Sequence, residues 1–240
     1  MALTKVDKTL LETTGVASAS TYLRGDGAWT AIASAGFSDT YSTDATATYT
    51  VPTDITKLLV IITGGGGGGA GGYEYTGKPG GAGSSATTVI ARVTVVPADT
   101  ITIGIGAAGA AGGSAAAVGT IGGNSTFTHA SGTGSGSMST ITAPGGQPGL
   151  YDASTVAPAA GTVGANNEGL SILGGYGSAG SANDFSVGGS SFWGGGGQGA
   201  QNLVQQSKAG TAYGSGGGGG NSQAVGGREN GAAGAAGVCF

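Results

Sequence analysis

Residues 58–72 read Leu58-Leu59-Val60-Ile61-Ile62-Thr63, followed by Gly64-Gly65-Gly66-Gly67-Gly68-Gly69-Ala70-Gly71-Gly72. A short continuous apolar run of this kind is typical of a β-strand that is buried on both faces. Here it continues directly into a block of glycine, and similar blocks recur along the chain. The blocks are residues 64–72, 104–113, 194–199, 214–220 and 226–237.

Two of these blocks carry glycine at every third position, from Gly106 to Gly112 and from Gly231 to Gly237. Three residues is the repeat of a polyproline-II-type helix, which is left-handed and has no internal hydrogen bonds. Each N–H and C=O in such a helix needs a partner elsewhere, and glycine lets two backbones approach closely enough to bond directly. The blocks are therefore predicted to pack against one another as polyglycine-II-type helices, which would form a rigid display surface.

Composition distinguishes this prediction from a flexible linker. Glycine makes up 56 of 240 residues, well above the usual share of about 7%. Linkers are also rich in glycine, but disordered chains tend to be charged and poor in aliphatic residues. Only 8% of this chain is charged and its mean hydropathy is +0.14. These values favour an ordered domain.

Charge limits the partners that the chain is expected to bind. The net charge is −4, and no basic stripe is present that could neutralise phosphates, so binding to nucleic acid is not expected. The longest apolar run is far shorter than the roughly 20 residues that span a bilayer, so membrane insertion is not expected either. A single cysteine, Cys239, cannot form an internal disulfide, so the fold does not depend on an oxidising compartment. No signal peptide is recognisable at the N-terminus.

The fold class expected for residues 36–240 is all-β. Apolar or alternating runs predict short strands near residues 48–51, 58–62, 89–96, 101–105, 126–128 and 138–142, with a last strand at 237–240. The turn chemistry at Pro97-Ala98-Asp99 predicts a hairpin between two of them. The prediction is a small β-sandwich core, mainly residues 36–145 plus the C-terminal strand. A layer of glycine-rich loops, mainly 146–237, would pack on it as polyglycine-II-type helices.

Residues 1–35 differ from the rest and are predicted to be an extended attachment segment with a linker. Leu3, Val6 and Leu10 fall at helical spacing, with Leu11 beside them. A helix of about two turns is marginal alone but is stabilised when packed on a partner. These four side chains are the candidate attachment residues.

Motifs that suggest catalysis or cofactor binding have ordinary explanations. Gly64-x-Gly66-x-x-Gly69 matches a dinucleotide-binding pattern, but the following residues cannot form the helix that this site requires. Gly72 to Lys78 resembles a phosphate loop, but Pro79 replaces the expected Ser or Thr. The one histidine, His129, has no carboxylate nearby in the sequence to orient it for a triad, although proximity in space stays open. We therefore expect no enzyme activity, cofactor or metal.

Aromatic residues within the glycine-rich framework are candidates for recognition, because rigid aromatic side chains on loops often anchor binding surfaces. Recognition is favoured for Tyr73, Tyr75, Tyr151 and Tyr176. Phe192 and Trp193 fit recognition and local packing equally well. The expected loops are residues 73–79, 147–156, 166–176 and 183–193. The candidate receptor-binding residues are Tyr73, Tyr75, Tyr151, Asn166, Asn167, Tyr176, Phe192 and Trp193.

The segment Ala19-Ser20-Thr21-Tyr22-Leu23-Arg24-Gly25-Asp26-Gly27-Ala28-Trp29-Thr30 resembles the "S-T-F-L-R-G-D-G-T-W" phrase of many bacteriophage tail-fibre proteins. There the phrase leads from a proximal region into a distal one, and its Arg-Gly-Asp has no connection with cell adhesion.

A second resemblance covers roughly residues 37–240. Tyr49-Thr50-Val51-Pro52, and the strand that runs into Gly64–Gly69, are similar to the phage glycine-rich domain. The hairpin Val93–Gly106 and the phrase Gly122-Gly123-Asn124-Ser125-Thr126-Phe127 match the same family, whereas the closing strand stops early at Phe240. The resemblance implies a virion protein near a fibre tip, made in the host cytoplasm and homotrimeric. Some phage adhesins of this kind stack polyglycine-II helices.

Together these features predict a non-enzymatic tail fibre that binds a host surface receptor. The N-terminus would attach to the tail or to an adaptor protein. The loops would contact a host surface polysaccharide or outer-membrane protein. The alternatives are a structural head fibre or capsid decoration protein, a depolymerase of surface glycans and an ice-binding polyglycine protein. The sparse acidic residues disfavour the depolymerase, because glycosidases use paired carboxylates.

Overall fold

The structure is a computed structural model. It describes residues 21–23, 29–31, 40–42, 46–72, 79–114, 117–131, 138–150, 157–165, 167–180, 186–200, 205–223 and 227–240. The chain divides into two compact units, Met1–Ser38 and Asp39–Phe240. Among the described residues the first unit contains one antiparallel pair, β1 (Thr21–Leu23) and β2 (Trp29–Ala31). The candidate attachment residues Leu3, Val6, Leu10 and Leu11 lie outside the described residues.

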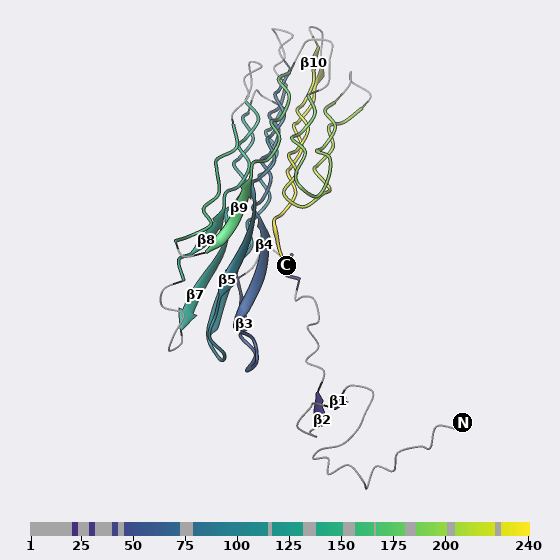
Figure 1. The fold of residues 1–240 in the computed structure, drawn as a ribbon. Helices are drawn as coiled ribbons and strands as arrows, with labels where there is room; N and C mark the ends of the chain where they lie inside the picture. Colours follow the sequence, from purple (N-terminus) through teal and green to yellow (C-terminus); the bar gives the residue numbers. More distant parts are fainter. Residues whose placement is uncertain are drawn as a thin grey trace, which may run out of the picture. The chain divides into compact units, whose positions relative to one another are not determined.

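The second unit is built on two antiparallel four-stranded sheets, which confirms the predicted all-β class (Figure 1). One sheet has the order β3 (Thr46–Thr50), β6 (Thr100–Gly104), β7 (Ser125–Ser131), β8 (Ile141–Ala143). The other has the order β12 (Val238–Cys239), β4 (Lys57–Thr63), β5 (Thr88–Thr94), β9 (Glu168–Ile172). A short hairpin joins β10 (Ser222–Gln223) to β11 (Gly227–Arg228). The described residues contain no helix long and apolar enough to cross a membrane.

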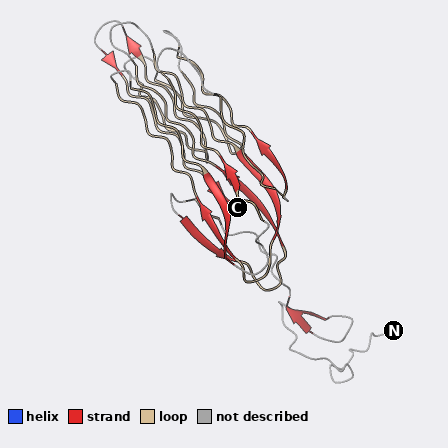
Figure 2. Cartoon of the chain, turned by 90° about the vertical axis from the view of Figure 1, so that its left-hand side faces the viewer, coloured by secondary structure: helices blue, strands red, loops and turns tan. Residues whose placement is uncertain are grey.

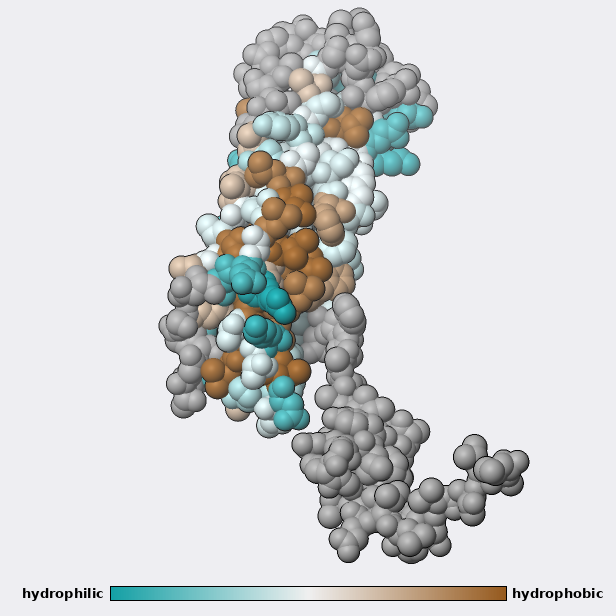
Figure 3. Space-filling model, in the orientation of Figure 1, coloured by the Kyte–Doolittle hydropathy of each residue, from teal (hydrophilic) through white to brown (hydrophobic). Residues whose placement is uncertain are grey.

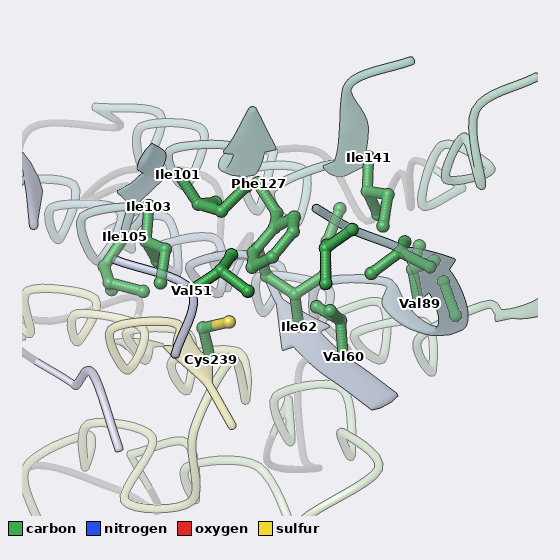
Figure 4. Close-up of a cluster of buried hydrophobic side chains, with 14 residues drawn as sticks. Val51, Val60, Ile62, Val89, Ile101, Ile103, Ile105, Phe127, Ile141 and Cys239 are labelled. Atoms are coloured by element: carbon green, nitrogen blue, oxygen red, sulfur yellow. The ribbon is translucent and has the colours of Figure 1, made fainter. Parts of the chain in front are cut away.

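The two sheets pack face to face around an aliphatic core (Figure 4). Val60 and Ile62 of β4 and Val89 of β5 face Ile103 of β6 and Phe127 of β7, and all five are buried. These residues alternate with outward-facing ones along each strand, which is the pattern of a strand with one buried face. Burial of each such side chain stabilises the fold by about 1.5–3 kcal/mol.

Cys239 belongs to this core. It is buried beside Val51 and Ile62 (Figure 4), and no disulfide partner exists because it is the only cysteine. Burial raises the pKa of its thiol from 9.0 to about 12, since a thiolate would lose its hydration there. The side chain therefore acts as a small apolar residue that packs the C-terminal strand into the sandwich.

The strands of both sheets continue directly into glycine-rich segments that run on from the sandwich (Figure 2). Strand β4 leads into residues 64–72, and residues 79–87 lead into β5. The hydrogen bonds continue as well, because Thr63 pairs with Thr88 in the sheet and Gly64 N–H donates to the Thr87 carbonyl just beyond it. The same continuity holds for the segments 105–113, 117–124, 144–150, 173–180 and 229–237.

Residues 64–72 form the centre of this glycine bundle. Their N–H groups donate to three antiparallel neighbours in strict rotation, at N···O distances of 2.8–3.2 Å. The first series, from positions 64, 67 and 70, goes to Thr87, Ser84 and Gly81. The second, from 65, 68 and 71, goes to Gly123, Thr120 and Ala117. The third, from 66, 69 and 72, goes to Ala235, Ala232 and Glu229. A rotation of three residues with no internal bond is the geometry of a polyglycine-II-type helix, as predicted.

The carbonyls of the same segment accept bonds from three parallel neighbours, for example from Gly109 to Gly66, Gly149 to Gly68 and Gly217 to Gly67. Among the described residues, residues 64–72 are thus surrounded by six segments: 79–87, 105–113, 117–124, 144–150, 214–220 and 229–237. The one side chain within this segment is the methyl group of Ala70, which is fully buried.

Space around this segment explains its run of glycine. A Cβ added at Gly67, Gly68 or Gly69 would overlap the carbonyl oxygen of Gln147, Ala110 or Gly218, respectively. These three oxygens belong to three different neighbours, so successive residues face different segments and each of them must be glycine.

The same rule accounts for the other blocks. Residues 214–220 are buried throughout and bond to six segments among the described residues: 64–72, 79–87, 186–191, 194–200, 205–210 and 229–237. The 105–113 segment lies at an edge of the bundle and has glycine at every third position from Gly106 to Gly112. Its Gly106, Gly109 and Gly112 are buried against neighbouring backbone, whereas Ala108 and Ala111 are exposed.

Two features of the fold differ from the sequence-based expectations. Residues 166–176 were expected to form a loop, but residues 168–172 form β9, which pairs with β5. Glycine segments also begin at residue 64 and alternate with the strands from there on. The physical reason is that strands continue directly as glycine segments, so the β core and the glycine layer are built from the same stretches of chain.

Candidate functional site

The path of the chain brings most of its connectors to one end of the glycine bundle. Each segment that leaves the sheets is followed by an antiparallel one that returns, as when Ala70 N–H donates to the Gly81 carbonyl. The chain therefore reverses at the end remote from the sheets, which we call the distal end. The described segments meet this end at residues 72 and 79, 114 and 117, 180 and 186, 200 and 205, and at the β10–β11 pair, and residues 144–150 also run toward it. We call the stretches of sequence that follow these segment ends the distal connectors.

Three of the predicted receptor-binding residues belong to these connectors. Tyr73 and Tyr75 lie between Gly72 and Pro79, and Tyr151 directly follows Leu150. All three are outside the described residues, as is Asn166. The described segments that flank Tyr73 and Tyr75 meet at the distal end, and the segment before Tyr151 ends there. Residues 157–165, which follow Tyr151, begin near the sheets, where Thr87 Oγ1 donates to the Ala159 carbonyl. The β10–β11 hairpin is also part of this end (Figure 1).

Asn167 lies elsewhere, immediately before β9. Its side-chain amide donates to the carbonyl of Val163 at 3.0 Å and to that of Ser139 at 3.4 Å. These bonds hold the residue before β9 against Ser139, which lies just before β8. The amide of Asn167 therefore has a structural role beside the sheet.

Tyr176 lies in the 173–180 segment, which bonds to residues 79–87 on one side. Its side chain is 63% exposed. Among the candidates that the structure describes, it is the one with the largest accessible surface, and it is placed along the side of the bundle.

Phe192 and Trp193 occupy a tight reversal at the opposite, sheet-proximal end of the bundle. Their neighbours Ser191 and Gly194 exchange backbone hydrogen bonds. The indole of Trp193 donates from Nε1 to Thr63 Oγ1 at 2.9 Å, at the point where β4 becomes glycine.

Trp193 is the centre of an aromatic cluster that also contains Phe192, Tyr213 and Phe240. Its ring lies edge-on to Phe192 at 5.0 Å and to Tyr213 at 6.4 Å, and tilted against Phe240 at 4.9 Å. Edge-to-face pairs of this kind are stabilising beyond the area that they bury. The cluster covers the outer face of the β12–β4 pair, so packing accounts for Trp193.

An apolar strip continues from this cluster along the outer face of the sheet. Phe240 exchanges backbone hydrogen bonds with Ile61 of β4. Ile61 pairs with Ile90 of β5, and Ile90 in turn pairs with Leu170 of β9. Leu170 is 59% exposed. Figure 3 shows the resulting hydrophobic patch in the middle of this face, with a hydrophilic band below it.

The structure brings His129 close to a carboxylate that is remote in sequence. His129 Nε2 lies 3.3 Å from Asp99 Oδ2. Asp99 is the last residue of the turn between β5 and β6, and it is 1% exposed. Both side chains are enclosed at the end of the sandwich away from the glycine bundle. The imidazole compensates a buried carboxyl group, which is the ordinary structural use of such a pair.

Metal ligands do not gather in the described part of the chain, where no group of three His, Cys, Asp or Glu side chains could hold an ion. The sequence analysis did not anticipate the clustering of Tyr213 and Phe240 with Trp193. A signal was present, because Trp193 and Tyr213 each directly precede a glycine block. Aromatic residues at both positions mark the sheet-proximal reversals.

Comparison with known protein families gives one match. The family described as "glycine-rich domain" matches residues 41–240, nearly the whole of the second unit. A search of curated proteins finds no match to the chain.

Proposed function

Because the chain belongs to the glycine-rich domain family, we propose that it is a receptor-binding fibre protein of a bacteriophage virion. In this proposal the distal connectors contact a polysaccharide or an outer-membrane protein on the host surface. The observation that carries it is a bundle held by main-chain hydrogen bonds, whose described segments run away from the sheets and return in alternation.

The bundle suits such a role because it holds its connectors from both sides. The 73–78 connector, for example, is bounded by Gly72 and Gly80, whose N–H groups bond to Glu229 and Gly220. A loop whose ends are fixed loses less conformational entropy on binding, so more of the contact energy contributes to affinity.

The N-terminal segment would provide attachment to the virion. Leu3, Val6, Leu10 and Leu11 would pack on the tail or on an adaptor, and the phage-like phrase at residues 19–30 would lead into the glycine-rich domain. Assembly as a homotrimer would present three distal ends together, so weak individual contacts would add up to firm adsorption. The protein would act without cofactor, metal or catalysis.

Replacing residues 73–78 by a Gly-Ser linker of equal length should reduce adsorption of the phage to its host by about tenfold or more. The replacement removes Tyr73 and Tyr75 but leaves every described hydrogen bond of the flanking segments in place. Adsorption is measured as the rate at which free particles disappear from a host culture, and gold-labelled antibody locates the protein on the particle.

Leu59→Ser is the control, because Leu59 is an exposed residue on the sheet, and it should leave adsorption unchanged. Equal adsorption by the linker variant and the unaltered chain would remove this connector from the binding surface. Label on the capsid would assign the chain to a head fibre or decoration protein. Release of reducing ends from host polysaccharide would make it a depolymerase.

A further inference from the structure

A polar cavity of about 550 Å³ opens near the distal end of the bundle. Its volume lies within the range of about 300–1,000 Å³ that is usual for small-molecule sites. The described side chains that line it are polar: Gln198, Gln205, Gln206, Ser207, Lys208 and Glu229.

Backbone bonds fix the walls of this cavity. Lys208 N–H donates to the Gln198 carbonyl at 2.7 Å, and Gly218 N–H donates to the Lys208 carbonyl at 3.1 Å. Ser207 Oγ donates to the Asn230 carbonyl at 2.7 Å. Four segments of the bundle are thereby held together, so the positions of their Cα atoms are set before any ligand arrives.

The ends of the long side chains remain unpaired. Within the described part of the chain, the amides of Gln198, Gln205 and Gln206 form no hydrogen bond, and Lys208 and Glu229 form no ion pair. Four of the five, Gln198, Gln205, Gln206 and Lys208, are exposed to solvent. Groups that are neither buried nor paired are available to a ligand without first breaking an internal bond.

The chemistry of this lining selects one class of ligand. Each glutamine amide offers two donor hydrogens and an acceptor oxygen, the ammonium of Lys208 offers donors only, and the carboxylate of Glu229 offers acceptors only. Hydroxyl groups both donate and accept, so a polyhydroxylated ligand can use all of these groups. One cation and one anion cancel, which gives an anionic ligand no net attraction. Among the described residues of the lining there is no aliphatic or aromatic side chain, which a lipid or an apolar ligand would need.

We propose that this cavity binds an uncharged carbohydrate, with the three glutamine amides, Lys208 and Glu229 as its hydrogen-bonding groups. The proposal rests on the proposed receptor-binding function and names its ligand class. Gly199 lines the cavity without a side chain, so a sugar can approach the backbone there.

The test uses the full-length purified chain on an array of neutral, amino-sugar and sialylated oligosaccharides. The strongest binder is then titrated by calorimetry against three pocket variants, Gln206→Ala, Lys208→Ala and Glu229→Gln. Each variant removes one hydrogen-bonding group, and each should weaken binding of a neutral oligosaccharide by about tenfold, because hydrogen bonds to charged or well-placed groups carry this much affinity.

Matched controls are Lys57→Ala and Glu168→Gln, which remove the same kinds of charge from exposed positions on the sheet. They should bind as the unaltered chain does. Preference for sialylated oligosaccharides, or neutral binding that the pocket variants leave intact, would overturn the proposal. No binding to any glycan would also overturn it, and intact adsorption of the phage in that case would show that the receptor-binding function stands without this pocket.

Discussion

Gly68→Ala is expected to destabilise the protein by about 3 kcal/mol or more, a lowering of the melting temperature of roughly 6–12 °C. The added methyl group would overlap the carbonyl oxygen of Ala110. Gly68 is also bonded on both sides, by donation to Thr120 and by acceptance from Gly149. Relief of the overlap therefore requires that segments separate and that several main-chain bonds lengthen together. Differential scanning calorimetry measures the change.

Gly195→Ala is the matched control, because an added Cβ at Gly195 would meet nothing within 4 Å. The change should leave the melting temperature nearly unaltered, or raise it slightly by restricting the unfolded chain. Equal melting temperatures for the two variants would mean that Gly68 is not enclosed by neighbouring backbone.

Trp193→Ala is expected to reduce the free energy of unfolding by about 3 kcal/mol, as is usual when a large packed aromatic side chain is truncated. The variant loses three ring contacts at once and leaves Thr63 Oγ1 without its indole donor. Chemical denaturation followed by circular dichroism measures the loss.

Phe192→Ala is the companion variant. Phe192 is 49% exposed and contacts only Trp193 among the described aromatic rings, so its loss should cost less than half as much. If Trp193→Ala instead leaves stability intact while adsorption falls, the cluster would be a recognition surface and the packing explanation would be wrong.

The sandwich was predictable because its core strands follow simple patterns. The run from Leu58 to Ile62 and the alternation of Ile101, Ile103 and Ile105 correspond to β4 and β6 and to the buried core. Strand β9 was not predicted, since Glu168-Gly169-Leu170-Ser171-Ile172 carries two aliphatic residues only. Those two share the outer face of the sheet, so the segment lacks the buried alternation that identifies an ordinary strand.

The glycine pattern contains more information than its period alone. The runs Gly64–Gly69 and Gly216–Gly220 are the two longest, and they belong to the two segments that are enclosed by six neighbours among the described residues. Glycine at every third position occurs in segments with fewer neighbours, since residues 105–113 bond to three segments and residues 229–237 to four among the described residues. A long glycine run thus indicates an enclosed segment, but an enclosed segment can also hold small side chains, because residues 79–87 are buried throughout and include Ala82 and Ser84. The pattern does not indicate which segment covers each face, because every neighbour presents the same backbone.

The candidate site was predicted only in part for the same reason. Tyr73, Tyr75 and Tyr151 lie outside the described residues, and Tyr176 lies along the side of the bundle and not at a reversal. The sequence left Trp193 open between recognition and packing, because it could not show that residues 192–193 form a sheet-proximal reversal. The distinction depends on the direction of each segment, which follows from the register of hydrogen bonds between residues far apart in the chain.

Amide hydrogen exchange, followed by NMR on the full-length protein, tests the central claim that the glycine segments are held together by main-chain hydrogen bonds. The amides of residues 64–72 and 214–220 should exchange about a thousandfold or more slowly than those of an unstructured peptide. The exposed Ala108 and Ala111, which donate no main-chain bond to another described residue, should exchange rapidly and serve as references within the same chain. Exchange of the enclosed glycine amides at the rate of these references would contradict the account.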